Sequence, residues 1–410
     1  MNGLEMASAK PVGRRQAVVW LIALLGSLTA FGPLSLDLYL PALPQLATDY
    51  GTSSSLAQLS LTSCMIGLSV GQLFAGAWSD VIGRRWPLLV GLAVYGIASL
   101  LCAMSPSIGT FIALRFIQGF AGSAGIVIAR AAARDMYEGP ELTRFFAMLM
   151  LVNGAAPILS PVIGGQLMKA MGWEGLFYVL AGWGLLLFVG VLFGLPETLL
   201  AEKRMTGGLG ETLRTFRRLL GNRRFMGFAL TQGLVSAAMF AYISGSPFVL
   251  QNIYGVSPQL FSVFFAVNGL GIIIAGQLTG RLAARVDEKK LFVAGLGIAL
   301  CGGVSLLAMI ALDAPLALIL IPLFFVVSSV GMVSTSGFVL AMGDQGHAAG
   351  SASALLGLMT FLLGGLLAPF VGIAGSSNAL PMGIIIAALE CCAVLVFLLM
   401  VHWRKTPAAV

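Results

Sequence analysis

The sequence predicts an all-α membrane protein with 12 transmembrane helices, arranged as two pseudo-symmetric six-helix halves. Of the 410 residues, 58% are hydrophobic and only 10% are charged, whereas soluble chains are about one quarter charged. The mean hydropathy is +0.97. The apolar residues form windows of about 20 residues, each long enough to cross a hydrocarbon core about 30 Å thick. These few charged residues could not cover a water-facing surface. The chain is therefore predicted to lie in a lipid bilayer.

Twelve apolar windows follow one another along the chain, separated by short polar loops. They span residues 17–42, 56–78, 87–105, 110–133, 142–168, 174–195, 225–250, 258–281, 291–311, 315–341, 349–373 and 380–402. An even number of spans places both termini on the same side of the membrane.

The longest polar stretch divides the chain into two halves. The predicted parts are a tail (1–16), a first half (17–195), a linker (196–224), a second half (225–403) and a tail (404–410). Within the linker, residues 209–220 have apolar positions at helical spacing together with arginines, which is typical of a basic amphipathic helix on an anionic leaflet. A disordered linker is the alternative. Residues 76–80 and 276–280 end the second helix of each half in a similar way, as expected for parallel repeats.

The basic residues predict the orientation of the chain. All of the 23 Lys and Arg residues except Lys169 and Arg115 fall in loops, tails or helix ends on the side of the termini. Cytoplasmic loops carry an excess of Lys and Arg, so both termini are predicted to be cytoplasmic. This bias also accounts for the net charge of +7. No nucleic-acid partner is expected, since no basic stretch is interleaved with aromatic residues.

Asp37, in the outer half of the first helix, is the strongest candidate for chemistry, because ionisable side chains at membrane depth are costly and usually functional. A carboxyl held away from water favours its neutral form. Alternation between dry and wet surroundings would therefore let Asp37 bind and release a proton. Two alternatives stay open, a permanent ion pair with Arg115 and a cap on a loop.

Arg115, inside the fourth helix, is charged at any useful pH and would supply a fixed positive charge. Gln118, Gly119 and Gly122 follow at three, four and seven residues and share its helical face. This stripe predicts the polar lining of an internal cavity, although an ion-pair scaffold would explain it as well.

Glu390 lies near the middle of the twelfth helix, between two apolar neighbours. It is predicted to be either a second protonatable coupling group or a neutral acid bonded to a neighbouring backbone.

Three prolines are predicted to bend helices that move. Pro157 and Pro161 lie on the fifth helix and Pro247 on the seventh, and each lacks a backbone donor. Bilayer interiors tolerate prolines where neighbouring helices or cavity water satisfy the freed groups. A fixed kink is the alternative.

Other patterns argue against several classes of protein. Gly67-Leu-Ser69-Val-Gly71 matches a hydrolase pattern, but it lies in mid-helix without a strand–turn–helix context. We interpret it as helix packing, and no enzyme activity is predicted. The chain has no phosphate-binding loop for ATP. His347 and His402 do not form a cluster, so neither a metal nor a cofactor is expected.

Four motifs resemble those of the major facilitator superfamily. Residues 76–85 (Gly-Ala-Trp-Ser-Asp-Val-Ile-Gly-Arg-Arg) are similar to its helix 2–3 loop signature, and residues 115–119 (Arg-Phe-Ile-Gln-Gly) to its helix 4 arginine motif. Residues 157–165 (Pro-Ile-Leu-Ser-Pro-Val-Ile-Gly-Gly) resemble the helix 5 motif associated with antiporters. Residues 196–198 (Pro-Glu-Thr) are typical of twelve-helix drug:proton antiporters.

Two further stretches narrow the resemblance to the Bcr/CflA (bicyclomycin/chloramphenicol resistance) family. These are residues 36–44 (Leu-Asp-Leu-Tyr-Leu-Pro-Ala-Leu-Pro) and 246–249 (Ser-Pro-Phe-Val). The resemblance implies a major facilitator fold in a bacterial inner membrane, with proton-driven export of hydrophobic drugs by alternating access. Asp37 would couple proton and substrate, with Arg115 as its partner. The rival function is a carrier of the same fold for one physiological solute, such as an amino acid or a nucleoside.

The resemblance also implies a cytoplasmic gate. Asp80 would cap a facing helix, and Arg84 would pair with Asp135 at the end of the fourth helix. A tight solvated turn is the alternative. The predicted gate residues are Gly76, Asp80, Gly83, Arg84, Arg85 and Asp135. Three positions depart from the family pattern: Val81 replaces a basic residue, Thr29 a second acid of the first helix, and Ser160 a glycine.

The predicted substrate cavity is apolar with few polar contacts. Besides the coupling residues, its predicted polar residues are Gln118, Asn153, Ser244, Asn268 and Ser334. The expected partners are a hydrophobic small molecule, protons and the bilayer, and the chain is expected to be a monomer.

Overall fold

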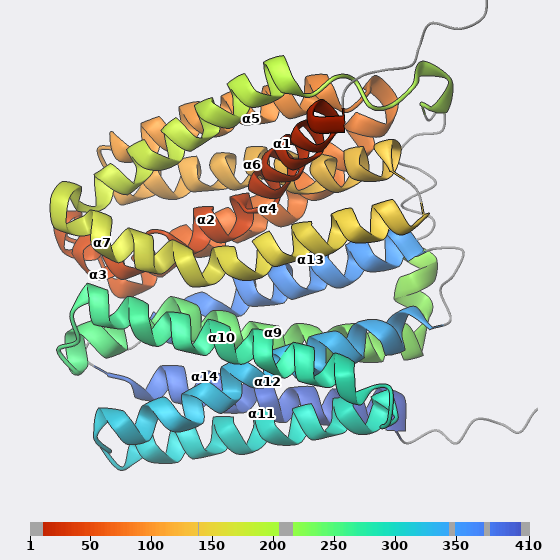
Figure 1. Cartoon of the computed structure of the whole chain (residues 1–410). Coiled ribbons are helices and arrows are strands. Elements are labelled where there is room, and N and C mark those ends of the chain that lie inside the picture. The colour runs from red at the N-terminus through yellow and green to blue at the C-terminus, as the bar shows by residue number, and fades with distance from the viewer. Residues whose placement is uncertain (1–10, 138, 205–215, 344–348, 373–377, 403–410) are drawn as a thin grey trace, which may run out of the picture.

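The computed structural model describes residues 11–137, 139–204, 216–343, 349–372 and 378–402, and nearly all of them are helical. The helices run side by side along one common direction (Figure 1). In chain order they are α1 (Pro11–Thr29), α2 (Phe31–Asp37), α3 (Leu43–Asp49), α4 (Ser54–Ile82), α5 (Arg85–Ala103), α6 (Ile108–Met136), α7 (Gly139–Gly194), α9 (Arg223–Phe248), α10 (Pro258–Leu282), α11 (Glu288–Ala311), α12 (Leu316–Met342), α13 (Ala349–Leu367) and α14 (Leu380–Phe397). Short helical turns add η1 (Leu40–Ala42), η2 (Ala201–Lys203), η3 (Val249–Ile253), η5 (Ala368–Gly372) and η6 (Leu398–His402).

The described residues form the twelve predicted spans. Ten helices are long and apolar enough to cross a membrane, and α1 to α3 supply another span that is bent by 45°. One of the ten, α7, is two spans, because Gly172 lies inside it with φ 62° and ψ −171°. Its two arms run in opposite directions in Figure 1. Only glycine adopts such a positive φ readily, so the break depends on this residue.

The first span differs from its prediction. The window 17–42 predicts one helix, whereas the structure begins α1 at Pro11 and interrupts the span around Ala30 and again after Asp37. Prolines at the start of η1 and of α3 fix the direction of the chain there. The linker helix predicted over residues 209–220 lies partly outside the described residues, and its residues 216–220 are helical.

Polar residues begin several helices where the sequence leaves the membrane. Ser53, Ser107 and Ser257 each accept a hydrogen bond from the backbone N–H three residues later. Asn222 does the same at the start of α9, and Asp287 caps α11. Such caps satisfy backbone donors that have no partner within the helix.

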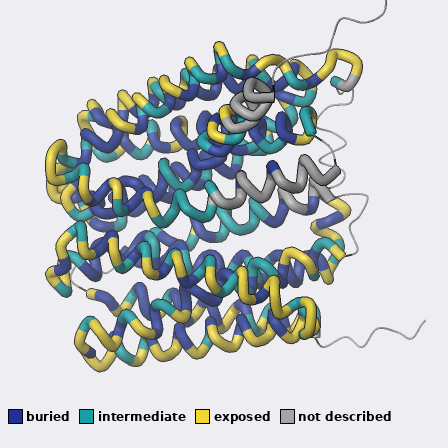
Figure 2. The backbone as a smooth tube through the Cα atoms, in the orientation of Figure 1, coloured by how far each residue is buried: buried dark blue, intermediate teal, exposed yellow. Residues whose placement is uncertain are grey.

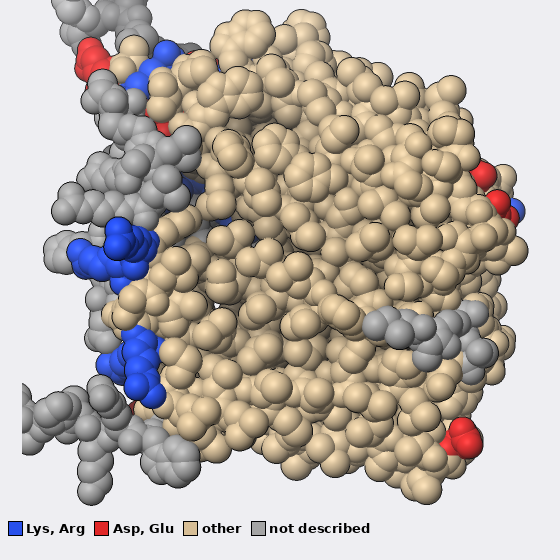
Figure 3. Space-filling model, turned by 180° about the vertical axis from the view of Figure 1, so that it is seen from behind, with Lys and Arg blue, Asp and Glu red and all other residues tan. Residues whose placement is uncertain are grey.

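The surface supports a membrane location. Large apolar side chains are exposed along the sides of the bundle, including Phe193, Leu185 and Ile274, and Figure 2 shows exposed residues along the outer helices. Figure 3 shows a broad side without charge, with Lys and Arg gathered at one end. We call this end, where α1 begins and η6 ends, the terminal end. An uncharged belt with charges at the ends matches the profile of a bilayer.

Small residues hold equivalent helix pairs together in both halves. A Cβ at Gly67 or Gly71 of α4 would collide with the backbone of α6, and one at Gly119 of α6 would collide with α4. In the second half, a Cβ at Gly331 of α12 would collide with Ile272 of α10. Close approach at small residues is the usual way in which helices associate in lipid. The interpretation of Gly67-x-Ser-x-Gly71 as packing is confirmed.

Gly67→Ala is expected to destabilise the protein by about 1–3 kcal/mol, the usual cost of overpacking. Its Cβ would lie against Phe116 O and 2.9 Å from Phe120 N, so α4 and α6 would have to separate. The measurement is thermal unfolding of the purified protein, followed by circular dichroism. Gly182→Ala is the matched control, since nothing lies within 4 Å of its added Cβ. Equal unfolding temperatures for the two variants would contradict the packing argument.

Candidate functional site

Asp37 ends α2 at the interruption of the first span and is 7% exposed. Among the described residues, no hydrogen bond or ion pair reaches its carboxyl group. The carbonyl of Leu38 packs against Gly164 of α7, where a Cβ would collide with it. Gly164 belongs to the predicted antiporter motif, so this motif lets α7 pack beside Asp37.

Tyr242 of the second half, in α9, lies within electrostatic range of the Asp37 carboxyl. Its hydroxyl accepts a hydrogen bond of 2.9 Å from Asn268 Nδ2 in α10. Tyr242 and Asn268 are both buried. This pair brings groups of the second half to the acid of the first half. Asn268 was predicted for the cavity, whereas sequence reasoning missed Tyr242, since an aromatic in an apolar helix gives no distinguishing signal.

Arg115 is fully buried in α6 and forms no ion pair with Asp37. Its Nη2 donates a hydrogen bond of 2.7 Å to the carbonyl of Ser35, and its Nη1 donates to Gln118 Oε1. The guanidinium carbon lies 4.4 Å from the centroid of the Tyr39 ring, a cation–π contact. Arg115 therefore holds the chain on both sides of Asp37. The permanent ion pair considered from the sequence is absent in this structure.

The predicted cavity stripe on α6 is a packing surface. Gln118 is fully buried and donates a hydrogen bond of 2.6 Å to Ser99 Oγ. A Cβ at Gly119 would meet Cys64 of α4, and one at Gly122 would lie 3.0 Å from the Tyr95 ring. The prediction that this face lines an open cavity was wrong for this conformation, because the helical spacing of small residues is the same for both uses.

The other predicted cavity residues are scattered. Ser244 is buried in α9, and its hydroxyl has no hydrogen-bond partner among the residues that the structure describes. Its place in the cavity stays a prediction. Ser334 lies half-buried on α12. The side chain of Asn153 lies outside the described residues.

Glu390 is fully buried on α14, and within the described part of the chain neither of its carboxyl oxygens has a hydrogen-bond partner. Its Cγ would lie 3.3 Å from a Cβ built on Gly303 of α11, so it packs between these two helices. The structure shows no hydrogen bond between Glu390 and the backbone of any described residue, so it does not support the alternative of a neutral acid bonded to a neighbouring backbone. A role in coupling stays a prediction.

The predicted gate residues come together at the terminal end. Arg84 Nε donates a hydrogen bond of 2.9 Å to Asp135 Oδ2, and Arg84 Nη1 contacts both Asp80 Oδ1 and Ser79 Oγ. Burial alone would lower the pKa of Arg84, but its bonds to the two carboxylates raise that pKa above its ordinary value. The Arg84–Asp135 pair is confirmed, and Arg84 is only 7% exposed, so the alternative of a solvated turn does not hold for Arg84. The role of this cluster as a gate stays a prediction.

Two details of the gate differ from expectation. Asp80 binds Arg84 and does not cap a facing helix, since it lies one helical turn before Arg84. The start of α5 is capped instead by Glu197, which accepts hydrogen bonds from the backbone N–H groups of Arg84 and Arg85. Of the other predicted gate residues, Gly76 lies beside Val127 of α6, and Gly83 has a φ of 115°.

The predicted prolines do not interrupt their helices in the same way. The chain stays helical through Pro157 and Pro161, whereas α9 passes into the π-helical turn η3 two residues after Pro247. The carbonyl of Pro161 accepts a hydrogen bond of 2.7 Å from Ser262 Oγ of α10.

Four hydrogen bonds join described residues of the two halves at the end opposite the terminal end. The donor–acceptor pairs are Ser55 with Pro369, Gln251 with Pro41, Gln259 with Gly165, and Ser262 with Pro161. The contacts of α4 with α13 and of α7 with α10 join the same halves. In this conformation the halves are therefore joined at the end away from the predicted gate residues.

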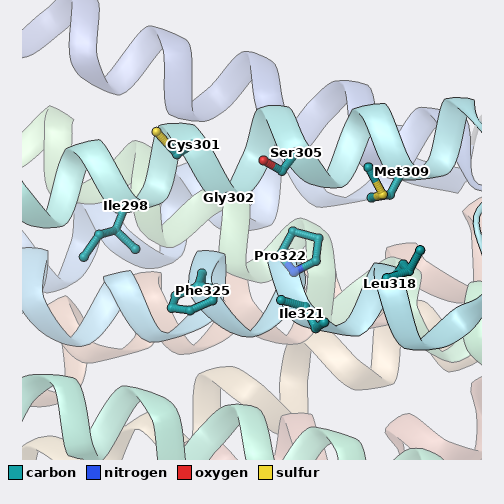
Figure 4. A pocket seen from close by; sticks show the side chains of 9 residues that line it. All are labelled: Ile298, Cys301, Gly302, Ser305, Met309, Leu318, Ile321, Pro322 and Phe325. Atoms are coloured by element: carbon teal, nitrogen blue, oxygen red, sulfur yellow. The ribbon is translucent and has the colours of Figure 1, made fainter.

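A groove on the described surface lies elsewhere. It measures about 420 Å³ and separates α11 from α12, with an almost wholly apolar lining (Figure 4). Several lining side chains, such as Ile321 and Phe325, are more than half exposed on the outside of the bundle. The groove contains none of the predicted coupling residues, so it is not the candidate site. The described residues contain no group of three His, Cys, Asp or Glu placed to hold a metal ion.

Comparisons with known proteins agree with this architecture. The sequence model of the Major Facilitator Superfamily matches residues 19–369. An uncharacterized MFS-type transporter of Bacillus subtilis is 46% identical over 92% of this chain and 93% of its own length. A bicyclomycin resistance protein homolog of Haemophilus influenzae is 31% identical over 88% of this chain and 91% of its own.

Two further matches extend the comparison. A chloramphenicol resistance protein of Pseudomonas aeruginosa is 28% identical over 89% of this chain and 85% of its own length. Among solved structures, an inward-facing bacterial homolog of the human lysosomal transporter Spinster has a TM-score of 0.75 at 14% identity, with coverage of 98% of this chain and 100% of that chain.

Proposed function

Because this chain belongs to the major facilitator superfamily, and within it to the Bcr/CflA family, we propose that it exports hydrophobic small molecules in exchange for protons. The observation that supports the proposal is Asp37, a buried carboxyl at a break in a membrane span that forms no hydrogen bond or ion pair with any residue the structure describes. Such an acid gains a proton where the surroundings are dry and loses it where water enters.

The transport cycle follows from the two ends of the bundle. The basic terminal end (Figure 3) faces the cytoplasm under the positive-inside rule. With the halves fastened at the opposite end, substrate reaches the cavity from the cytoplasm or the inner leaflet. Opening of the opposite end then lets a proton from outside bind Asp37 and release the substrate. The drug-resistance relatives support a hydrophobic substrate.

The driving force is sufficient for useful export. Moving one charge through a membrane potential of 100 mV provides about 2.3 kcal/mol, and each 1.4 kcal/mol changes an equilibrium about tenfold. One proton exchanged for one neutral molecule therefore sustains a concentration ratio of about 50.

The proposal is tested in everted vesicles whose lumen has been acidified by respiration and is followed with a fluorescent pH probe. Candidate drugs come from a susceptibility panel in an efflux-deficient host. For a drug to which the chain gives resistance, addition to the vesicles is expected to raise the lumenal pH, because protons leave as the drug enters. Acidification of the lumen, or no resistance and no pH response with any drug, would exclude drug:proton exchange and favour a carrier for a metabolite.

A further inference from the structure

A carboxylate outside the coupling site joins two distant segments of the first half. Glu197 lies just after α7. Its Oε1 accepts hydrogen bonds from the backbone N–H of Arg84 at 2.8 Å and of Leu199 at 3.0 Å, and its Oε2 accepts one from the N–H of Arg85 at 3.2 Å. One side chain thus binds the first turn of α5 and orders its own loop.

The first turn of α5 needs such a partner. Backbone N–H groups at the start of a helix have no acceptor within it, and the side chain of Arg84, the residue before α5, provides none. That side chain extends toward Asp80 and Asp135 instead. A carboxylate at a helix N-terminus is also favoured by the helix dipole.

Gly83 makes room for the carboxylate. Its φ of 115° places it in a conformation that side-chain-bearing residues rarely adopt. A Cβ there would lie 2.8 Å from the Glu197 carboxyl carbon. Both the shape of the α4–α5 turn and the absence of a side chain at this position therefore admit Glu197.

Neighbouring contacts join the terminal ends of α5, α6 and α7. Thr198 Oγ1 donates a hydrogen bond of 3.2 Å to Asp135 Oδ2 at the end of α6. Arg85 Nη2 donates one of 2.5 Å to the carbonyl of Leu192 in the last turns of α7. We call Glu197 and Thr198, with these partners, the clasp.

We propose that Glu197 is a positioning residue of the gate, which fixes the first turn of α5 so that the Arg84 guanidinium stays between Asp80 and Asp135. The clasp makes the terminal ends of α4, α5, α6 and α7 a single rigid unit that moves together when the halves rearrange. The part of this inference that concerns transport rests on the proposed function.

The clasp is intact at neutral pH. Burial alone would raise the pKa of Glu197, but the backbone bonds from Arg84, Leu199 and Arg85, with the charge of Arg204, lower it below its ordinary value of 4.5. A carboxyl whose pKa is lowered by folding stabilises the folded state at pH values above its ordinary pKa. This stabilisation is lost as the pH falls through the lowered pKa. The other charged groups facing the clasp are Asp80, Asp135 and the Arg84 and Arg85 side chains.

Hydrogen–deuterium exchange at neutral pH tests the cap without any substrate. In Glu197→Gln the side chain keeps its shape but loses its charge and one acceptor oxygen. The amides of Arg84 and Arg85 are expected to exchange about tenfold faster than in the wild type, the usual effect of losing a charged hydrogen bond. Glu202→Gln, an exposed acid on η2, is the matched control and should exchange like the wild type. Unchanged exchange in Glu197→Gln would overturn the cap.

Transport kinetics test the positioning role. Glu197→Gln is expected to lower the maximal export rate several-fold with little change in the half-saturating drug concentration, because the gate and not the binding cavity is affected. Glu197→Asp, which keeps the charge, should recover part of the rate. Faster exchange with a normal transport rate would overturn the positioning role. Failure of the wild type to transport any drug would count against the proposed function alone, because the exchange rates still decide the cap.

Discussion

Replacement of Asp37 by Asn is expected to abolish proton-driven export while substrate binding changes only a few-fold. Asn has nearly the same shape as a protonated Asp but cannot release a proton. Because the Asp37 carboxyl is buried and has no partner among the described residues, the change breaks no contact and should leave the fold intact. Drug accumulation in everted vesicles should fall from about 50-fold per 100 mV to no accumulation.

Two measurements separate this outcome from misfolding. Drug binding to purified Asp37→Asn by calorimetry shows whether the cavity survives, and vesicle uptake with and without a pH gradient shows whether coupling survives. Asp313→Asn is the matched control, since it makes the same chemical change at an exposed loop residue whose φ of 49° suits Asn. Gradient-driven uptake by Asp37→Asn at the wild-type rate would rule out Asp37 as the coupling acid.

The membrane fold was predictable because the solvent dictates it. In lipid every backbone group must be bonded within its own helix, so apolar length alone predicts most spans. The interruption of the first span was not predicted, because residues 30–42 are still mostly apolar and continue the hydrophobic window without a polar loop. The sequence predicted α7 as two helices separated by a loop. In the structure the only non-helical residue between them is Gly172.

The candidate site was predictable in its residues and less so in its contacts. Scarcity made Asp37, Arg115 and Glu390 visible, because charges at membrane depth are rare. Their partners depend on packing between distant helices. Arg115 is held by a carbonyl and by an aromatic ring, and neither is a charged partner that a sequence would suggest.

Among the predicted gate residues, too, the sequence predicted some contacts and missed others. The Arg84–Asp135 pair joins oppositely charged residues at two helix ends and was predicted from the loop signature. Glu197 belongs to a recognised motif, but it binds backbone N–H groups at the start of α5. Because every residue but proline has such a group, the sequence of α5 does not indicate this contact. A glycine at the preceding turn, Gly83, was the only signal of the space that Glu197 occupies.

Arg115→Lys is expected to remove most of the transport activity although the positive charge is kept. The planar guanidinium donates in two directions, to the Ser35 carbonyl and to Gln118, while its face lies over the Tyr39 ring. A lysine ammonium on a flexible stem cannot reproduce this geometry. Each lost hydrogen bond from a charged group costs about 1.5–3 kcal/mol, so the segment that carries Asp37 should loosen.

The comparison with Arg115→Lys distinguishes a charge effect from a positioning effect. If Arg115 acts only through its field on Asp37, lysine should preserve both the rate and the pH dependence of export. If Arg115 acts by holding Ser35 and Tyr39 on either side of Asp37, lysine should lower the rate about tenfold or more, as loss of one such bond implies, and shift the pH profile. Arg218→Lys, at an exposed position before α9, controls for the substitution itself. Wild-type transport by Arg115→Lys would contradict the positioning role, because the fork-shaped contacts would then be dispensable and the charge alone would suffice.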